Sequence, residues 1–351
     1  MRNIRVATVA QLAEYDDIID VRSPAEYATD HIPGAISAPV LNDEERAMVG
    51  TLYKQVSPFE AKKLGAALVS RNIANHLETL FRDKPKQWKV LVYCWRGGQR
   101  SGAMSHILGQ IGWQADKLQG GYKNFRRHVL AELEQLPGPL TFRVICGATG
   151  SGKSRLLQIL HEHGEQVLDL EQLAQHRGSL LGGLPNEPQP SQKMFETRLW
   201  DKLRHFDTRR PIFVEAESKK IGSLAMPDAL LEKIRASACI LIDAPLSARI
   251  DLLLEEYDHF LQTPGLLAGR LSHLTELHGR KVIAEWQAMA ERGEWRTLVE
   301  QLLVQHYDPA YRRSTQSNFP LLPRATHLQH AALDAASLKK SAVTLSEITV
   351  A

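Results

Sequence analysis

A cysteine accompanied by two arginines and two glycines directly follows an apolar run. Residues 94–101 read CWRGGQRS, and residues 89–93 before them read KVLVY. Loop amides, the N-terminus of a following helix and a nearby arginine all favour a thiolate over a thiol. We therefore expect Cys94 to be a nucleophile or the carrier of a chalcogen atom, not a buried structural cysteine. The residues expected to hold an anion beside it are Arg96, Gly97, Gly98, Gln99, Arg100 and Ser101.

The second chemical pattern is a glycine-rich loop between an apolar run and a helix-like run. Residues 147–154 read GATGSGKS and fit G-x-x-x-x-G-K-[ST] in full. The glycines allow successive backbone N–H groups to face one anion, and the following helix adds its positive end. Lys153 would bridge two phosphates, and Ser154 could ligate Mg²⁺. The predicted phosphate-binding residues are Gly147, Thr149, Gly150, Ser151, Gly152, Lys153 and Ser154.

More than one carboxylate could bind a metal ion beside this loop. Glu215 and Glu217 follow one apolar run, and Asp243 ends another. A charged residue at the end of a strand is often only solvated, so these alternatives stay open. The loop predicts a bound phosphate group and does not by itself predict ATP hydrolysis, because a diphosphate on another molecule would satisfy the same amides.

Strand-like and helix-like segments alternate along the chain, which predicts an α/β architecture with mainly parallel sheets. Residues 42–80 read as helical, and another helix begins near Ser101. Residues from about 326 onward are rich in alanine and leucine and predict a closing helix. The predicted buried strands are residues 17–21, 89–93, 140–146, 211–215 and 239–243.

Residues 137–139, PGP, are the clearest break in the pattern, and we place a domain boundary there. The predicted domains are residues 1–137, with a helical insert at about 42–80, and residues 138–351, with a C-terminal helical region. A chain of 351 residues with 43% hydrophobic content can bury two cores of this size.

Charge and cysteine content narrow the class of protein. The net charge is +3, and pairs of basic residues are scattered along the chain. Each pair fits a solvated surface, and together the pairs are compatible with a polyanionic partner. Three cysteines imply no disulfide framework, and Cys146 and Cys239 lie in apolar runs as small hydrophobes. Because no apolar run approaches the roughly 20 residues that span a bilayer, we expect a cytoplasmic protein without membrane contact.

Two upstream segments extend the cysteine pattern. Residues 20–27 read DVRSPAEY and residues 31–35 read HIPGA. Together with the cysteine loop they resemble the rhodanese domain, in which Asp20 and Arg22 would shape the scaffold. The resemblance implies a persulfide-type or selenium-type intermediate on Cys94.

The spacing departs from ordinary sulfurtransferases, which usually place an arginine five residues after the cysteine. Here Gln99 holds that position and Arg100 follows it. The longer spacing resembles the rhodanese-fold phosphatases, whose loop encircles a larger oxyanion. A phosphate-like donor such as selenophosphate fits it better than thiosulfate, and a phosphatase remains an alternative.

The combination of a rhodanese domain with a phosphate-binding loop is similar to the bacterial tRNA 2-selenouridine synthases. The similarity also covers residues 49–54, VGTLYK, and residues 169–179, DLEQLAQHRGS. It predicts an N-terminal rhodanese-like domain and a C-terminal P-loop NTPase-like parallel-sheet domain. The further substrate-binding candidates are Asp169, His176, Arg177 and Glu215.

The family resemblance also implies the chemistry. The enzymes act on wobble 2-thiouridine in tRNA, alkylating its sulfur with geranyl diphosphate and then introducing selenium from selenophosphate. Lys153 and its loop would hold the diphosphate, Cys94 would carry selenium as a selenosulfide, and Arg96 and Arg100 would hold selenophosphate or the tRNA backbone. No tightly bound cofactor and no permanently held metal ion are expected, although Mg²⁺ could bind through Ser154. A selenophosphate-supplying enzyme is an expected partner.

Three other functions stay open. A P-loop kinase or ATPase with a regulatory rhodanese module predicts nucleotide turnover without tRNA. An RNA-binding protein without chemistry would not need both intact loops, and a plain sulfurtransferase is disfavoured by the loop spacing. Residues 180–184, LLGGL, could line a lipid groove, although a buried turn is the commoner role.

Overall fold

The computed structural model describes residues 4–179, 181–183 and 187–350. It divides into two compact units, one comprising Met1–Glu132 and Ser191–Asp201, the other Leu133–Pro190 and Lys202–Ala351. Each is built on a five-stranded parallel sheet with helices, which confirms the predicted α/β fold class.

The units are not contiguous in sequence, which differs from the predicted division at residue 137. Most of helix α8 (Gln192–Leu203) belongs to the first unit. The Trp200 ring packs edge-on against Phe125, with 5.5 Å between the ring centroids. A proline–glycine break marks an interruption of the chain, but it carries no information about which core a later helix joins.

In the first unit the strand order is β1-β5-β4-β2-β3. Central strand β4 is buried at every position except Lys89 and leads into the cysteine loop. The strands are β1 (Val6–Ala7), β2 (Asp17–Asp20), β3 (Ile36–Ser37), β4 (Lys89–Tyr93) and β5 (Gln114–Leu118). The helices are η1 (Val9–Glu14), α1 (Pro24–Thr29), α2 (Asp43–Gln55), α3 (Pro58–Glu78), α4 (Gln99–Ile111) and α5 (Gly121–Leu133).

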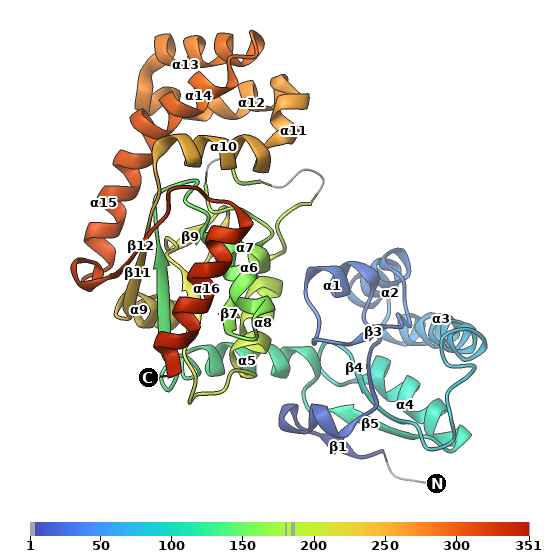
Figure 1. Cartoon of the computed structure of the whole chain (residues 1–351). Helices are drawn as coiled ribbons and strands as arrows, with labels where there is room; N and C mark the ends of the chain where they lie inside the picture. Colours follow the sequence, from blue (N-terminus) through green and yellow to red (C-terminus); the bar gives the residue numbers. More distant parts are fainter. Residues whose placement is uncertain (1–3, 180, 184–186, 351) are drawn as a thin grey trace. The chain divides into compact units, whose positions relative to one another are not determined.

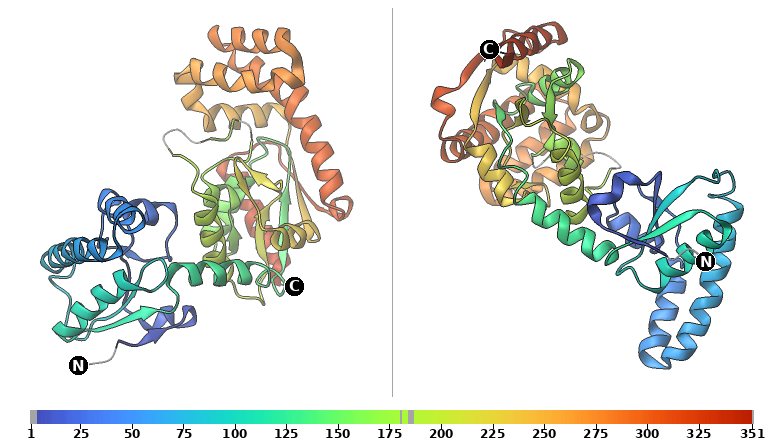
Figure 2. Two further views of the ribbon diagram at one scale, coloured as in Figure 1. Left: turned by 180° about the vertical axis from the view of Figure 1, so that it is seen from behind. Right: turned by 90° about the horizontal axis from the view of Figure 1, so that it is seen from below.

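The helical insert predicted at residues 42–80 is the pair α2 and α3. The two helices lie side by side as a hairpin (Figure 2). Asn42 starts α2 by accepting a hydrogen bond from the Glu45 amide at 2.8 Å, while the Glu45 carboxylate accepts one from the Asn42 amide at 2.9 Å. This reciprocal cap satisfies two amides that the first helical turn would otherwise leave free.

In the second unit the strand order is β12-β11-β6-β8-β7. Strand β6 is central, so the phosphate-binding loop that follows it lies at the carboxyl edge of the sheet. The strands are β6 (Phe142–Cys146), β7 (Gln166–Leu168), β8 (Ile212–Glu215), β11 (Ala238–Asp243) and β12 (Thr326–Gln329), with a separate antiparallel pair β9 (Lys220–Ile221) and β10 (Leu224–Ala225).

The helices of this unit cover its sheet and add a helical layer. Helices α10 to α14 stack beyond the carboxyl end of the sheet (Figure 1) around buried residues such as Trp286 and Leu298. The helices are α6 (Lys153–Glu162), α7 (Leu170–Ala174), α9 (Asp228–Arg235), α10 (Leu246–Glu256), α11 (Asp258–Gln262), α12 (Pro264–Leu271), η2 (Ser272–Leu274), α13 (Thr275–Glu291), α14 (Trp295–Leu302), the π-helix η3 (Leu303–Tyr307), α15 (Asp308–Asn318), η4 (Leu322–Arg324) and α16 (Ala335–Val350).

The tail differs in part from its predicted closing helix. Residues Thr326–Gln329 form β12, which pairs in parallel with β11, and the helix α16 begins only at Ala335. Leu328 and Leu338 are buried in the same apolar cluster as α6. The short strand was missed because only one of its four residues is buried, which leaves little apolar pattern to detect. No helix within the described residues is long and apolar enough to cross a membrane.

Candidate functional site

The cysteine loop joins β4 to α4 and is braced by the start of α5. The backbone amides of Tyr122 and Lys123 donate to the carbonyls of Cys94 and Trp95, at 2.9 and 3.0 Å. Gly121 permits this close approach, since its φ is +58° and a Cβ there would lie 2.2 Å from the Cys94 carbonyl oxygen. The shape of the loop therefore depends on a glycine outside the sequence pattern that predicted it.

The Cys94 side chain is only 4% exposed and packs in an apolar cluster, but its sulfur has polar neighbours. Sγ lies 3.3 Å from the Ser101 hydroxyl oxygen. Burial raises the pKa of the Cys94 thiol, but hydrogen bonds from Ser101 and the Gly98 backbone, with the charge of Arg100, outweigh burial and lower that pKa below its ordinary value. The site therefore favours a thiolate although it is largely closed.

The two arginines of the loop differ in their surroundings. Arg100 Nη1 donates to Glu26 Oε2 at 2.9 Å, and Arg46 Nε lies 3.0 Å from the same oxygen. Burial raises the pKa of the Glu26 carboxyl, but the hydrogen bond and charge of Arg100, with that of Arg46, lower it overall. Arg96 is exposed. An anion beside Cys94 would therefore meet an Arg100 already oriented by a carboxylate.

The remaining predicted residues of the cysteine loop shape its backbone or begin the helix that follows it. Gly97 has a φ of +66°, and a Cβ there would lie 2.8 Å from the Leu118 carbonyl oxygen. Gly98 is the N-cap of α4, and Gln99 is the first residue of that helix and is exposed. The helix N-terminus consequently lies next to the sulfur, where its partial positive charge favours an anion.

A buried network of polar side chains lies behind the loop, and helix α8 contributes Thr197 to it. Arg22 is bound by Asp20 and donates to the Asp30 carbonyl at 2.6 Å, and its guanidinium carbon lies 3.9 Å from the Tyr122 ring centroid. Asp30 Oδ2 accepts from Tyr122 at 2.7 Å and from Thr197 at 3.1 Å. Because the Tyr122 amide braces Cys94, this network fixes the back of the cysteine loop.

The phosphate-binding loop runs from β6 into α6. Gly150 and Gly152 have φ values of +78° and +81°, a region that favours glycine. Lys153 Nζ donates to the Gly147 carbonyl at 2.8 Å, and the Gly147 amide donates to the Tyr311 hydroxyl oxygen at 2.5 Å. The sequence pattern did not predict Tyr311, which comes from α15, and its local sequence carries no signal of this contact.

The other loop residues are held by neighbouring elements. Arg249 Nε donates to the Thr149 carbonyl at 2.9 Å. Ser151 is buried, and among the described atoms its hydroxyl has no hydrogen-bond partner. Ser154 donates to Glu171 Oε2 at 3.0 Å.

A wide cleft of about 990 Å³, lined by both charged and apolar side chains, opens over the phosphate-binding loop. It is bounded on one side by the loop and α6 and on another by α15. Its lining residues include Thr149, Gly150, Ser151, Gly152, Lys153, Ser154, Asp169, Glu171, Arg177, Glu217, Tyr311 and Ser314. The predicted phosphate-binding residues from 149 to 154 therefore share one cavity, and Gly147 lies behind them.

Carboxyl groups gather near Lys153, and their protonation is shifted. Burial, followed by the charge of Glu171, raises the pKa of Glu217 to about 8. Burial likewise raises the pKa values of Asp169 and Glu171. The charge of Lys153 opposes this effect at Glu171, whose pKa is nevertheless raised overall. In the part of the chain that the structure describes, no three or more His, Cys, Asp or Glu side chains are arranged to hold a metal ion.

Glu215, a substrate-binding candidate from the sequence, is not among the residues that line this cleft. Its Oε1 accepts from the Leu170 and Glu171 amides at 2.8 and 2.9 Å, which anchors the start of α7, and burial raises its pKa well above the ordinary value. Asp169 caps the same helix by accepting from the Gln172 amide at 2.8 Å. Glu217, two residues further on, is the carboxyl that lines the cleft.

His176 and Arg177 separate in the structure. His176 is buried, and burial followed by the charge of Arg270 lowers its pKa. Arg177 lines the cleft, where its Nη1 donates to the Glu256 carbonyl at 2.7 Å and its guanidinium carbon lies 4.7 Å from the Tyr257 ring centroid. Arg177 thus lies where a ligand of the loop would pass, whereas His176 lies in the interior.

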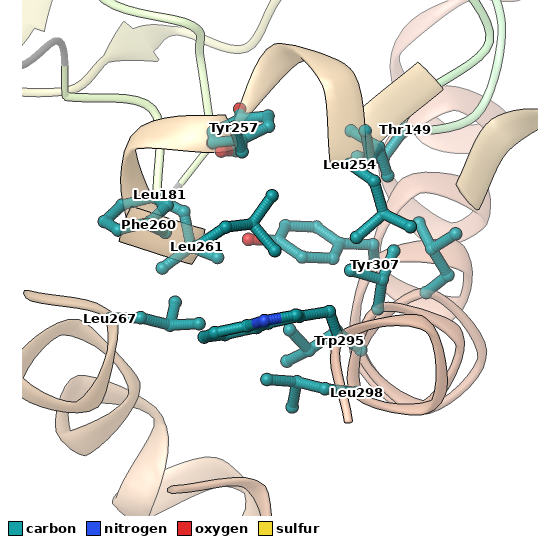
Figure 3. Close-up of a pocket in the computed structure, with 15 residues that line it drawn as sticks. Thr149, Leu181, Leu254, Tyr257, Phe260, Leu261, Leu267, Trp295, Leu298 and Tyr307 are labelled. Atoms are coloured by element: carbon teal, nitrogen blue, oxygen red, sulfur yellow. The ribbon is translucent and has the colours of Figure 1, made fainter. Parts of the chain in front are cut away.

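A second, apolar pocket adjoins the cleft (Figure 3). It is lined by residues of α10, α11, α12, α14 and η3 and includes Leu181. Leu180 and Leu184 of the predicted apolar segment lie outside the described residues. As a candidate lipid groove, the sequence had singled out only the segment 180–184, to which Leu181 belongs. The other walls come from separate helices whose apolar residues resemble ordinary core positions.

Two family models match the chain. One describes the tRNA 2-selenouridine synthase AAA domain and matches residues 140–279, and the other describes the rhodanese-like domain and matches residues 6–128. These matches agree with the predicted arrangement of a rhodanese-like fold followed by a P-loop-type fold.

Curated relatives are similar to this chain over most of its length. A tRNA 2-selenouridine synthase from Nitrosomonas europaea is 39% identical over 251 residues, which are 70% of this chain and 64% of the relative. One from Shewanella halifaxensis is 32% identical over 327 residues, which are 84% of this chain and 87% of the relative. The chain thus spans slightly less than two thirds of the first relative and most of the second.

Among solved structures, a rhodanese-related protein from Thermoplasma volcanium is 20% identical and covers 35% of this chain and 92% of its own, with a TM-score of 0.23. That score is too low to add to the assignment of the fold.

Proposed function

Because the chain belongs to the tRNA 2-selenouridine synthase family, we propose that it is a transferase that converts wobble 2-thiouridine in tRNA into 2-selenouridine. The observation that carries the proposal is the presence, in one chain, of a cysteine with a lowered pKa and a phosphate-binding loop. The names of its relatives supply tRNA as the substrate class.

The first proposed step is S-geranylation with geranyl diphosphate. The 2-thio sulfur attacks the first carbon of the geranyl group, the carbon–oxygen bond breaks, and the base loses its N3 proton. Lys153 and the loop amides stabilise the departing diphosphate electrostatically. Ser154 and Glu171, whose side chains lie 3.0 Å apart, are the residues that would hold Mg²⁺ on the diphosphate.

Geranylation prepares the base for the second step. A thiocarbonyl sulfur is a poor leaving group, whereas the thioether formed by alkylation leaves as geranyl thiolate from an electron-poor carbon. The selenium of selenophosphate attacks this carbon and expels the thiolate. The overall exchange converts selenophosphate into phosphate and changes no oxidation state.

Electron balance narrows the role of Cys94. A selenosulfide formed from the Cys94 thiolate and a selenide equivalent would lose two electrons and would need an oxidant. We therefore replace the expected selenosulfide by a redox-neutral step, in which the Cys94 thiolate takes the phosphoryl group from selenium and water then hydrolyses the phosphocysteine. The spacing from Cys94 to Arg100, similar to that of rhodanese-fold phosphatases, supports this role.

Reconstitution with the purified full chain tests the proposal. A tRNA that contains wobble 2-thiouridine is incubated with geranyl diphosphate alone and then with selenophosphate, and its nucleosides are analysed by mass spectrometry. We expect S-geranyl-2-thiouridine first and 2-selenouridine second. Rapid ATP hydrolysis with unchanged tRNA would instead support a P-loop ATPase and overturn the proposal.

A further inference from the structure

The apolar pocket beside the phosphate-binding loop has walls of almost uniform chemistry. Leu298, Leu302 and Leu303 of α14 and η3 are buried, as are Phe260 and Leu267 from α11 and α12. The only polar side chains among its lining residues are Thr149, Ser179, Tyr257, Tyr307 and Trp295. Such a lining can bury hydrocarbon and offers few partners to a nucleotide base, whose ring nitrogens and amino groups need hydrogen bonds.

The pocket and the phosphate cleft share part of their walls. The residues that line both are Thr149, Ser179, Leu253, Tyr257 and Tyr307. Thr149 belongs to the phosphate-binding loop itself. A ligand whose anionic head lies on the loop can therefore continue into the apolar pocket, so the two cavities together match a molecule with a phosphate head and a hydrocarbon tail.

Trp295 lies at the far side of the pocket from Thr149. Figure 3 shows its indole ring between Leu267 and Leu298, with Tyr307 and Leu261 between the ring and the phosphate-loop side. Trp295 is half-buried at the first turn of α14. It is the bulkiest side chain in the lining, and a tail entering from the loop would meet it last.

We propose that this pocket binds the hydrocarbon tail of the diphosphate donor and that Trp295 limits the length of tail that the pocket accepts. This inference rests on the proposed function, because it takes the occupant of the phosphate-binding loop to be an allylic diphosphate. It adds the site of the tail and the residue that selects its length.

The pocket must widen to receive a ten-carbon tail. Its cavity volume is about 70 Å³, compared with about 990 Å³ for the cleft. An apolar cavity of roughly 150 Å³ accommodates a molecule as small as benzene. Trp295 is half-buried and is the bulkiest side chain of the wall. Widening costs free energy for any tail, so chain-length preference depends on how far the wall side chains, Trp295 above all, can move.

Binding measurements with the wild-type full chain test the site without requiring chemistry. Isothermal titration compares inorganic diphosphate with dimethylallyl, geranyl and farnesyl diphosphates. We expect geranyl diphosphate to bind at least tenfold more tightly than dimethylallyl diphosphate, and farnesyl diphosphate to bind no more tightly than geranyl diphosphate. Equal affinity for all three allylic diphosphates would overturn the inference.

Two variants assign the tail to this pocket. Leu267→Trp fills it and should weaken geranyl diphosphate binding at least tenfold while inorganic diphosphate binding is unchanged. Leu266→Trp is the matched control, because Leu266 is the exposed neighbour in the same helix. Trp295→Ala should raise the affinity for farnesyl relative to geranyl diphosphate at least fivefold.

The outcomes separate this inference from the proposed function. If inorganic diphosphate and all allylic diphosphates fail to bind, the diphosphate role of the loop is wrong and both proposals fall. If diphosphate binds and tail length matters, but neither Leu267→Trp nor Trp295→Ala changes the tail preference, the tail lies elsewhere and only this inference falls. Thermal unfolding of each variant verifies its fold. If a variant does not fold, the binding of the three allylic diphosphates to the wild-type chain alone decides whether the inference holds.

Discussion

The cysteine loop and the phosphate-binding loop occupy equivalent positions in their sheets, but they differ in how far solvent reaches them. Each follows the central strand of a parallel sheet and precedes a helix. Cys94 is 4% exposed, with its sulfur beside Ser101 and with Arg100 already paired to a carboxylate. Lys153 instead borders a cleft of about 990 Å³.

The two loops also shift protonation in opposite directions. The cysteine loop lowers the pKa of its thiol, whereas the cleft raises the pKa of Glu217 to about 8. The first site is organised around one small anion, the sulfur itself. The second raises the pKa of its carboxyls and keeps Lys153 on a backbone carbonyl, so a large anionic ligand must replace contacts that the chain makes with itself.

The largest expected effect is that of Cys94→Ser, which tests whether each loop serves a different reaction step. Cys94→Ser should reduce conversion of geranylated tRNA to 2-selenouridine by at least about a thousandfold, because a serine hydroxyl is not ionised at neutral pH. Geranylation of 2-thiouridine should continue at the wild-type rate. Nucleoside mass spectrometry measures both steps, and undiminished 2-selenouridine would remove Cys94 from the mechanism.

The reciprocal change is Lys153→Ala. Loss of the cation beside the departing diphosphate should slow geranylation by about a hundredfold, while tRNA supplied already geranylated should still be converted to 2-selenouridine. Lys339→Ala, at an exposed lysine of the same unit, is the control and should leave both rates unchanged. Equal loss of both steps would show that the two loops do not divide the reaction.

Glu217→Gln tests the raised pKa in the cleft. A carboxyl whose folded-state pKa lies above its ordinary value of 4.5 binds its proton more tightly in the folded state, so its contribution to stability is full below pH 4.5 and is lost as pH rises through about 8. Wild type should lose about 3 kcal/mol of stability between pH 5.5 and pH 8.5 through this group, and the variant should lack that loss.

Urea unfolding at pH 5.5 and pH 8.5 measures this difference. Glu347→Gln, at an exposed position of α16, serves as the control. If wild type and Glu217→Gln lose stability equally between the two pH values, the proton on Glu217 does not account for the pH dependence.

The smallest expected effect concerns the hydroxyl beside the sulfur. Ser101→Ala removes a hydrogen bond that favours the thiolate, so the Cys94 pKa should rise and iodoacetamide should alkylate Cys94 roughly fivefold more slowly at pH 7. The rate at high pH, where the thiol is fully ionised, should be nearly unchanged. Ser105→Ala, at a buried serine one turn further along α4, should show no such pH-dependent change.

The sequence alone determined the features that depend on neighbouring residues. Both loops, their preceding strands and their following helices are local patterns, since glycines, a lysine and an apolar run act within about ten residues of one another. The α/β class followed from the alternation of such runs. For the same reason the sequence predicted the insert at 42–80 as helical, and the predicted strands 89–93 and 211–215 lie within one residue of the strands β4 and β8.

Only the tertiary structure decided which distant residues complete each site. Tyr311 meets Gly147, Thr197 reaches Asp30 behind the cysteine loop, and residues of α10, α11, α12, α14 and η3 line the apolar pocket. These contacts arise because packing buries whichever apolar and polar surfaces fit together, whatever their separation in the chain. A leucine that will line a pocket and a leucine that will fill a core look alike in sequence, and only the shape of the space between helices distinguishes them.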